Sequence, residues 1–142
     1  AATPLMTQTD ATKLRAAADM LVADLAYAQS ESISHSDNPR LVVFTTATHS
    51  YRIATTSTPN TPITHPIDKG LYLTTMGQGR AAQLPGVRIQ SYSLGGDDRV
   101  GFGMYGQLDQ AANATVTLAC GSRTVVITLN PITGEASIGP IN

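Results

Sequence analysis

Residues 11–34, ATKLRAAADMLVADLAYAQSESIS, are the stretch of sequence that decides the fold. No Gly or Pro interrupts this run, and alanine, the strongest helix former, is frequent in it. Small and apolar residues recur in alternating steps of three and four, which places them on one side of an α-helix: Ala11, Leu14, Ala18, Leu21, Leu25, Ala28 and Ser32. Val22 and Ile33 widen that side into a stripe. The pattern predicts a helix over residues 10–35, roughly 35 Å long at about 1.5 Å per residue.

The polar residues of this helix are expected largely on the side away from the stripe: Asp10, Lys13, Asp24 and Glu31. Arg15 and Asp19 are spaced i,i+4 and predict an exposed ion pair worth only a few tenths of a kcal/mol. A helix with one apolar side must bury that side against other elements. No other segment has a comparable helical pattern, so the rest of the chain has to supply the surface on which the helix packs.

Two short segments bound the helix. Residues 1–9, which include Pro4, are expected to form a lead-in. Thr9 or Asp10 can act as the N-cap, because either side chain can accept a hydrogen bond from a free backbone amide. The helix is expected to end before Pro39, since proline disfavours helical geometry in the residue that precedes it.

Residues 40–142 are predicted to be β-rich. Alternating or β-branched patterns predict strands over residues 41–46, 50–54, 71–74, 87–94, 99–105, 115–120, 123–129 and 135–138. Val87, Ile89 and Ser91 are expected on one face of their strand. Residues 55–70 are rich in proline and threonine and are expected to be irregular, either as a surface loop or as a partly mobile flap.

Two hairpins are predicted from short connections between these strands. The first joins residues 41–46 and 50–54. The second has the clearest signal, because Gly121-Ser122 suits a two-residue type II′ turn between residues 115–120 and 123–129. That turn places Leu118 opposite Val125 and Val116 opposite Ile127. One long helix followed by a mostly antiparallel sheet is an α+β arrangement.

The composition is that of a single domain with little net charge. The chain has 142 residues, of which 13% are charged, and its net charge is −1. This length favours one domain over residues 1–142. The near-zero charge provides no overall field that would attract nucleic acid or an anionic membrane.

Residues that could carry chemistry are scattered along the chain. His35, His49 and His65 lack the spacing of a zinc site and are interpreted as three unrelated surface residues. Asp97 and Asp98 follow two glycines and are interpreted as part of a turn, because calcium requires six or more oxygen ligands.

The single cysteine and the arginines do not predict a site either. Cys120 cannot form an internal disulfide and is expected to be a small buried hydrophobic residue on a strand. No G-x-S-x-G motif is present to supply a nucleophile. Four arginines form a basic strip only if the fold gathers them: Arg80, Arg88, Arg99 and Arg123. No catalytic, cofactor-binding or metal-binding residue is therefore assigned, no cofactor is expected, and the chain is not expected to be an enzyme.

Three stretches together resemble the minor pseudopilins of type II secretion and type IV pili, of the GspH and FimT type. Residues 25–33, LAYAQSESI, are similar to the family's leucine followed by A-R-S-E-A-I, with Gln29 and Ser32 as departures. Residues 102–106, FGMYG, resemble the aromatic-x-x-x-Gly segment that precedes the last hairpin. Residues 125–138, with Thr133-Gly134 before a short final strand, resemble the family's C-terminal end.

The resemblance implies a pilin-like fold and a structural function in a helical fibre that helps to drive protein export. Members of the family carry a prepilin-type leader, N-terminal methylation and an apolar membrane-embedded helix half ahead of the soluble part. None of those residues is in this sequence, so we expect a soluble part that begins about 20 residues, one membrane span, into the mature protein. The full-length protein is then expected to be a single-pass inner-membrane protein facing the periplasm, or part of a surface fibre.

The expected partners are other pilins or pseudopilins, bound through the outward side of residues 10–31 and adjoining loops. Without an apolar helix half, the soluble domain is expected to be a monomer or a weak self-associator. One alternative is a DNA-binding minor pilin, although the C-terminal tail GEASIGPIN has no basic residue to contact phosphates. Another is an exported ligand-binding module, which the 5% aromatic content and the absence of Trp disfavour.

Overall fold

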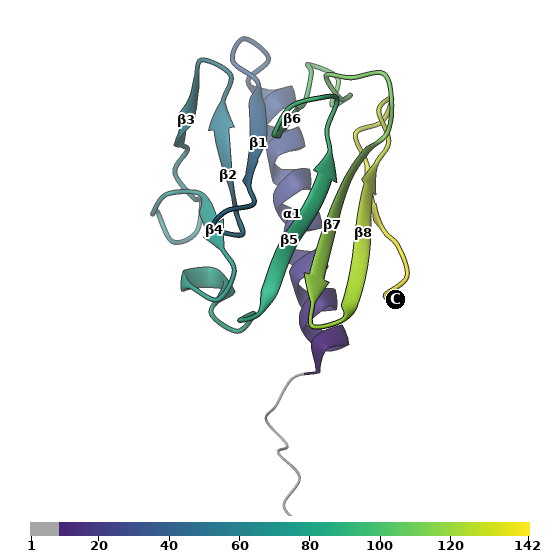
Figure 1. The fold of residues 1–142 in the computed structure, drawn as a ribbon. Helices are drawn as coiled ribbons and strands as arrows, with labels where there is room; N and C mark the ends of the chain where they lie inside the picture. Colours follow the sequence, from purple (N-terminus) through teal and green to yellow (C-terminus); the bar gives the residue numbers. More distant parts are fainter. Residues whose placement is uncertain (1–8) are drawn as a thin grey trace, which may run out of the picture.

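A computed structural model describes residues 9–142 and shows one long helix packed on two antiparallel sheets (Figure 1). The predicted lead-in, including Pro4, lies outside the described residues except for Thr9. The helix α1 spans Asp10–Ser34, one residue shorter than predicted. The strands are β1 Arg40–Thr45, β2 Ser50–Thr55, β3 Thr58–Pro62, β4 Leu73–Thr75, β5 Val87–Ser93, β6 Arg99–Gly101, β7 Ala114–Cys120, β8 Arg123–Leu129 and β9 Ala136–Ile138. A single 3₁₀ turn, η1, covers Gly79–Ala81.

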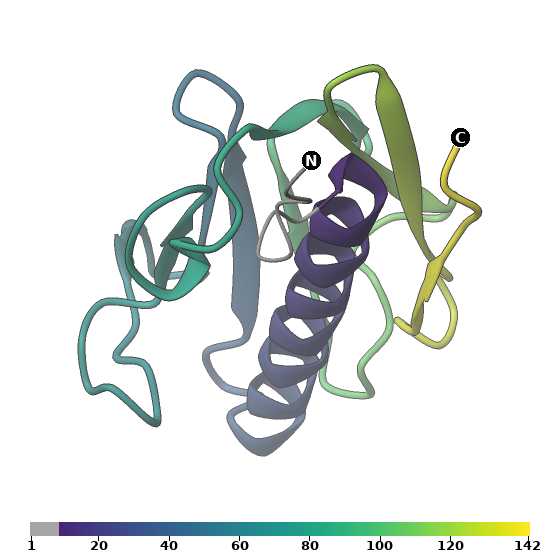
Figure 2. The ribbon, with the colours of Figure 1, turned by 90° about the horizontal axis from the view of Figure 1, so that it is seen from below.

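The strands divide into two sheets that lie side by side across one side of α1 (Figures 1 and 2). The first sheet has the order β3-β2-β1-β6, with β4 also paired to β2, and the second has the order β5-β7-β8-β9. Every pairing is antiparallel. The arrangement is the α+β fold expected from the sequence, with the predicted sheet split in two.

The apolar stripe of α1 forms the centre of the core that joins the two sheets. Thr9 is the N-cap, and its hydroxyl accepts a hydrogen bond from the backbone N–H of Thr12 at 3.1 Å. The buried residues of the helix are most of the predicted stripe together with Ala17 and Asp24: Leu14, Ala17, Ala18, Leu21, Asp24, Leu25, Ala28 and Ser32. Ile33 does not widen the stripe as predicted, since it is 51% exposed at the last turn, beyond the sheets.

Both predicted hairpins are confirmed. β1 pairs with β2 across the turn at residues 46–49. β7 pairs with β8 in the predicted register, with Leu118 opposite Val125 and Val116 opposite Ile127. Gly121 has φ +62°, as the first central residue of a type II′ turn requires.

Two strand predictions were wrong because of local backbone irregularities. Ser91 does not share a face with Val87 and Ile89, because a β-bulge between Ile89 and Ser91 shifts the register. After the bulge, Tyr92 lies opposite the buried Val116 and Ser91 is exposed. The strand predicted over residues 99–105 ends at Gly101.

The end of β6 has a simple cause in the residues that follow it. The chain turns tightly, with the backbone N–H of Gly106 donating to the carbonyl of Gly103 at 3.0 Å. Gly106 has φ +82°, which glycine adopts readily. Phe102 and Leu108 then form an isolated bridge across this turn instead of extending the strand.

Residues 55–70 are more regular than predicted. They contain β3, which pairs with β2 at the edge of the first sheet. Prolines are tolerated there because an edge strand does not need every backbone N–H for pairing. The strand predicted at residues 71–74 begins at Leu73, and Leu71 forms only an isolated bridge with Thr64.

Candidate functional site

The outer side of α1 is the first surface that could bind a partner. The sheets flank the helix, and none of the strands formed by residues 9–142 covers its outer side (Figure 2). The exposed residues on this side are mostly small: Thr12, Arg15, Ala16, Asp19, Ala23, Ala26 and Ser30. Small side chains allow another backbone to approach closely. The predicted ion pair between Arg15 and Asp19 is not formed among the described side chains, as is common for exposed pairs in water.

Asp24 is buried, contrary to the prediction that it faces away from the stripe. Only 5% of it is exposed. The hydroxyl of Tyr51 donates to its Oδ2, and that of Tyr72 donates to its Oδ1 at 2.5 Å. Arg80 completes the surroundings, with Nη1 at 3.7 Å from Oδ1. Asp24 follows Leu21 by three residues, at the edge of the stripe, where the two tyrosines from distant strands and loops reach it.

The Asp24 cluster (Asp24, Tyr51, Tyr72, Thr74 and Arg80) connects the helix to the first sheet and to η1. Burial and the neighbouring carboxylate of Asp24 raise the pKa of both tyrosines, that of Tyr51 well above its ordinary value. Both hydroxyls therefore remain protonated and donate to the carboxylate. Arg80 also donates to the hydroxyl of Thr74, and its guanidinium lies 4.8 Å from the centroid of the Tyr72 ring. The carboxylate of Asp24 and the hydroxyls of Tyr51, Tyr72 and Thr74 all have partners within the cluster, which is typical of a structural network rather than a reactive centre.

The three histidines lie apart, as predicted, but one of them is not at the surface. His65 is buried, its ring centroid lies 4.5 Å from that of Tyr72, and its Nδ1 accepts a hydrogen bond from the backbone N–H of Ile67 at 3.1 Å. The prediction failed because the proline-rich segment folds back onto Tyr72. His49 is half-buried and accepts from the backbone N–H of Ile89 at 3.2 Å. Within residues 9–142, no group of three His, Cys, Asp or Glu side chains is arranged to hold a metal ion.

The predicted basic strip does not form. Arg80 is paired with Asp24 at 3.7 Å, and Arg99 is paired with Asp98 at 2.9 Å. Arg88 donates to the carbonyl of Gly121 at 3.2 Å, beside the β7–β8 turn. Arg123 begins β8 on the other side of that turn, opposite Cys120. The fold therefore gathers Arg88 and Arg123 at one end of the molecule and separates them from the other two.

Cys120 and the neighbouring pair Asp97 and Asp98 have local structural roles. Cys120 is buried on β7 as predicted, and both burial and the nearby Asp10 raise the pKa of its thiol. A thiol with a raised pKa is a poor nucleophile at neutral pH. Asp97 accepts a hydrogen bond from the backbone N–H of Arg99 at 3.1 Å, which is ordinary turn chemistry.

A second candidate surface lies at the end of the molecule where α1 terminates. Four exposed apolar side chains, here called the apical patch, come from the helix end and from two loops: Ile33, Met104, Tyr105 and Ile132. Tyr105 is 81% exposed and Ile132 is 82% exposed, unusual values for such large side chains.

Gln29 holds the two loops of this patch against the helix. Its side-chain amide donates to the carbonyls of Gly106 at 2.9 Å and of Thr133 at 2.7 Å. Gly134 has φ +70°, and a Cβ there would overlap the carbonyl oxygen of Gly106, so only glycine fits. The sequence marked Gln29 as a departure from a family pattern but gave no signal for this contact with residues over 70 positions away.

The fold has known counterparts among solved structures. No family model matches the chain, and no curated protein matches its sequence. The type IV minor pilin FimU of Pseudomonas aeruginosa is similar over 89% of this chain and 93% of its own, with 16% identity and a TM-score of 0.60. The minor pseudopilin EpsH of the type 2 secretion system of Vibrio cholerae is similar over 89% of this chain and 96% of its own, with 14% identity and a TM-score of 0.61. The chain therefore has the pilin-like α+β fold that minor pilins and minor pseudopilins share, as the resemblance in its sequence predicted.

Proposed function

We propose that this chain is a structural subunit of a pilus or a type II secretion pseudopilus and acts by assembly rather than by catalysis. The observation that carries the proposal is that the two sides of α1 have different roles. One side of the helix holds both sheets together. The other side is built mostly from small residues and is covered by no strand in the part of the chain that the structure describes. In a pilin-like fold, that free side is available to neighbouring helices.

No helix within residues 9–142 is long and apolar enough to cross a bilayer. The family resemblance supports the proposal that an apolar helix half precedes α1 and anchors the full-length protein in the inner membrane before assembly. We propose that this half bundles with those of other subunits inside the fibre while the two sheets face outward on the periplasmic side.

The outer side of α1 is the proposed contact with other pilins or pseudopilins. Ala23 and Ala26 are exposed near its middle, where a large or charged side chain would hold a neighbouring helix away. The expected partners are therefore helices that also present small residues, and the contact is expected to be modest in the absence of the apolar half.

The test is an arginine substitution on this side in the full-length protein. Ala23→Arg should strongly reduce crosslinking to co-expressed pilin or pseudopilin subunits and incorporation into fibres, because it places a long charged side chain in the contact. Ala82→Arg, at an exposed alanine beyond η1, is the matched control. Both variants should unfold at the temperature of the parent. Normal incorporation of Ala23→Arg would contradict the proposal.

A further inference from the structure

We propose that the end of the molecule at which α1 terminates binds the opposite end of a second copy of this chain, in a head-to-tail contact. The inference rests on the proposed function, because it assigns a partner surface within the fibre. The two ends are here called the apical end, which includes the apical patch, and the basal end, where α1 begins and the β7–β8 turn lies (Figure 1).

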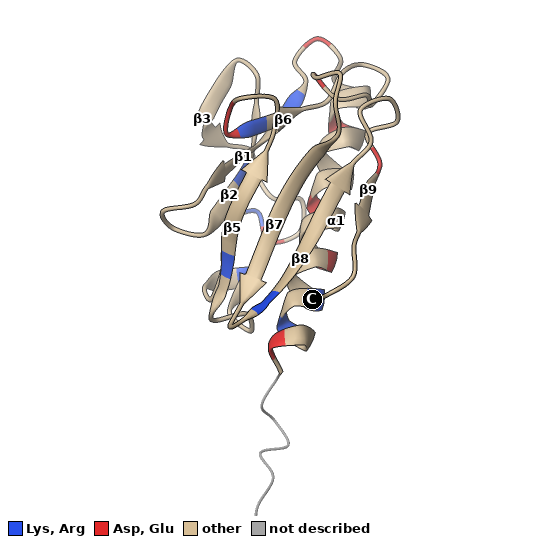
Figure 3. Ribbon diagram, turned by 45° about the vertical axis from the view of Figure 1, so that its right-hand side comes forward, with Lys and Arg blue, Asp and Glu red and all other residues tan. Residues whose placement is uncertain are grey.

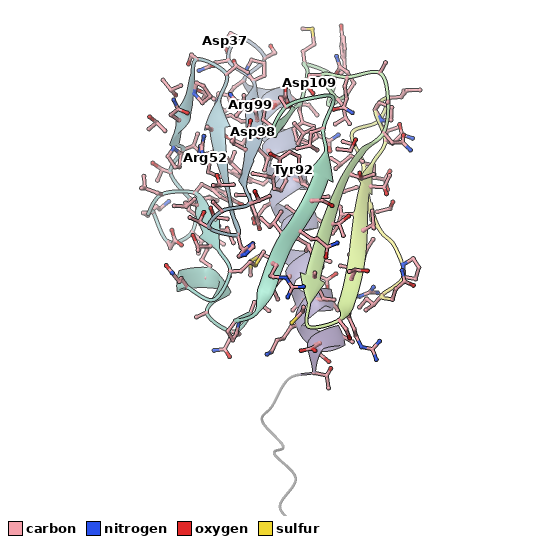
Figure 4. The ribbon with its side chains drawn as sticks, in the orientation of Figure 1. Asp37, Arg52, Tyr92, Asp98, Arg99 and Asp109 are labelled. Carbon is pink, nitrogen blue, oxygen red and sulfur yellow. The ribbon has the colours of Figure 1, made fainter. Side chains whose placement is uncertain are left out.

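The apical end is acidic. Figure 4 places Asp37, Asp98 and Asp109 in this upper part of the molecule. Of the arginines there, Arg99 pairs with Asp98 and Arg40 pairs with Glu31 at 3.4 Å. Arg52 lies opposite Val43, level with Arg99, and donates to the carbonyl of Pro59, so the carboxylates at this end still outnumber the arginines. Within residues 9–142, no ion pair involves the remaining carboxylates: Asp37, Asp97, Asp109 and Glu135.

Two of these carboxylates, Asp97 and Asp109, lie close enough to repel each other. Burial and the neighbouring Asp97 raise the pKa of Asp109, while backbone hydrogen bonds at Gly101 and at Asp109 itself oppose that shift. A basic surface brought against this end would relieve the repulsion between Asp97 and Asp109 instead of adding to it.

The basal end is basic. Figure 3 shows Lys and Arg at the lower ends of β5 and β8 and in the first turns of α1. These residues form no ion pair in the described part of the chain: Lys13, Arg15, Arg88 and Arg123. Asp10 and Asp19 are the carboxylates nearby in sequence, and Asp10 is directed at the thiol of Cys120, 3.5 Å away. The two ends of one molecule are therefore complementary in charge.

The apical patch adds a shape-based component to this complementarity. The clamp by Gln29 and the close approach of Gly134 to Gly106 hold its loops in place before any partner binds, which lowers the entropic cost of docking. Tyr105 presents an exposed ring that suits the guanidinium of an arginine. The aliphatic stems of basal arginines can cover the apolar side chains around it.

The direction of the contact fits a fibre. The two ends are separated by the length of α1, 25 residues, or about 37 Å at 1.5 Å per residue. A contact between two different surfaces of identical copies does not close on itself unless the rotation brings it back, and so it can repeat along an axis. Between isolated copies it should be weak, while the effective concentration inside a fibre would make it significant.

Charge reversal with mutual rescue tests the inference on the chain as it stands. The apical variant is Asp37→Lys with Glu135→Lys, and the basal variant is Arg88→Glu with Arg123→Glu. All four positions are exposed or half-buried, and only Arg88 has a side-chain hydrogen bond. Self-association is measured by sedimentation and by concentration-dependent amide chemical shifts up to about 1 mM, at low and high salt.

The parent should associate weakly and less at high salt, with shifts at both ends. Each double variant should bind its own copies at least about tenfold more weakly than the parent does, because like charges then meet. An equimolar mixture of the two variants should regain the association, because the reversed apical end meets the reversed basal end. Lys69→Glu, in the loop between β3 and β4, should behave as the parent.

Two results would overturn the inference. One is a parent that shows no salt-sensitive association up to about 1 mM together with a mixture that regains none. The other is crosslinking of the apical patch to a different subunit in fibres while copies of this chain ignore it. Either result leaves the proposed function in place, since that depends on incorporation through the outer side of α1 and is tested separately by Ala23→Arg.

Discussion

At the scale of the residue, Asp24 shows how one buried carboxylate organises a region of the protein. A carboxylate on the edge of an apolar stripe is costly to bury unless its oxygens are satisfied. Here two tyrosine hydroxyls and one guanidinium satisfy them. The residues come from the helix, β2 and the segment around η1, so the cluster fixes how the irregular part of the first sheet sits on α1.

Removing this carboxylate should therefore destabilise the fold measurably. Asp24→Ala leaves the hydroxyls of Tyr51 and Tyr72 and the charge of Arg80 without their buried acceptor. We expect a loss of about 1–3 kcal/mol in the free energy of unfolding, measured by urea denaturation. Asp19→Ala, at an exposed position of the same helix, should change it by less than about 0.5 kcal/mol. Equal stability of the two variants would mean that the cluster contributes nothing net.

The same cluster predicts a dependence of stability on alkaline pH. The folded protein holds the protons of Tyr51 and Tyr72 more tightly than the unfolded chain does, because both pKa values are raised from 10.0. The stabilisation is therefore fully present below pH 10 and is lost as the pH rises above the unfolded value. Tyr72→Phe should reduce the loss of stability per pH unit above pH 10. The measurement is the unfolding temperature as a function of pH, from neutral to strongly alkaline pH. An unchanged slope in Tyr72→Phe would contradict the assignment to this residue.

At the scale of the element, α1 is the part on which both sheets depend. Leu25 is 1% exposed and lies mid-stripe. Leu25→Ala should lower the free energy of unfolding by about 2–5 kcal/mol, the range for core leucines. Ala26→Ser is the control. Ala26 follows Leu25 directly but is exposed on the outer side of α1, so this small change should leave the unfolding temperature almost unchanged. If Leu25→Ala unfolded like the parent, the stripe would not be part of the core.

The elements that the sequence predicted well are those determined by neighbouring residues. The helix and the β7–β8 hairpin follow from spacing within a few residues, and both formed in the predicted place and register. The bulge in β5 and the burial of Asp24 depend instead on contacts with distant segments. Tyr51 is 27 residues from Asp24, and Tyr72 is 48 residues away. No local pattern contains that information, so these predictions failed.

The candidate surfaces were predictable to the same limited extent. The outward side of the helix was expected as the partner surface because the amphipathic pattern defines it directly. The apical patch was not, because Ile33, Tyr105 and Ile132 meet only after the chain has folded. Gln29 illustrates the difference, since its role depends on two carbonyls supplied by loops near the other end of the sequence.

At the scale of the whole molecule, the charges are separated although their sum is close to zero. This separation bears on the DNA-binding alternative. The basal end offers four basic side chains, Lys13, Arg15, Arg88 and Arg123, from the first turns of α1 and the lower ends of β5 and β8 (Figure 3). Four cations can neutralise at most about four phosphates, which supports only weak, non-specific binding at physiological salt.

We therefore expect no binding of duplex DNA at micromolar protein concentration and physiological salt, measured by the fluorescence anisotropy of a labelled duplex. The variant Arg88→Glu with Arg123→Glu is the matched control, because it removes half of the basal cations without touching the outer side of α1. Salt-sensitive micromolar binding by the parent that this variant abolishes would contradict the expectation. It would also give the basal end a nucleic-acid partner, and the head-to-tail contact would then have to compete with DNA for the same arginines.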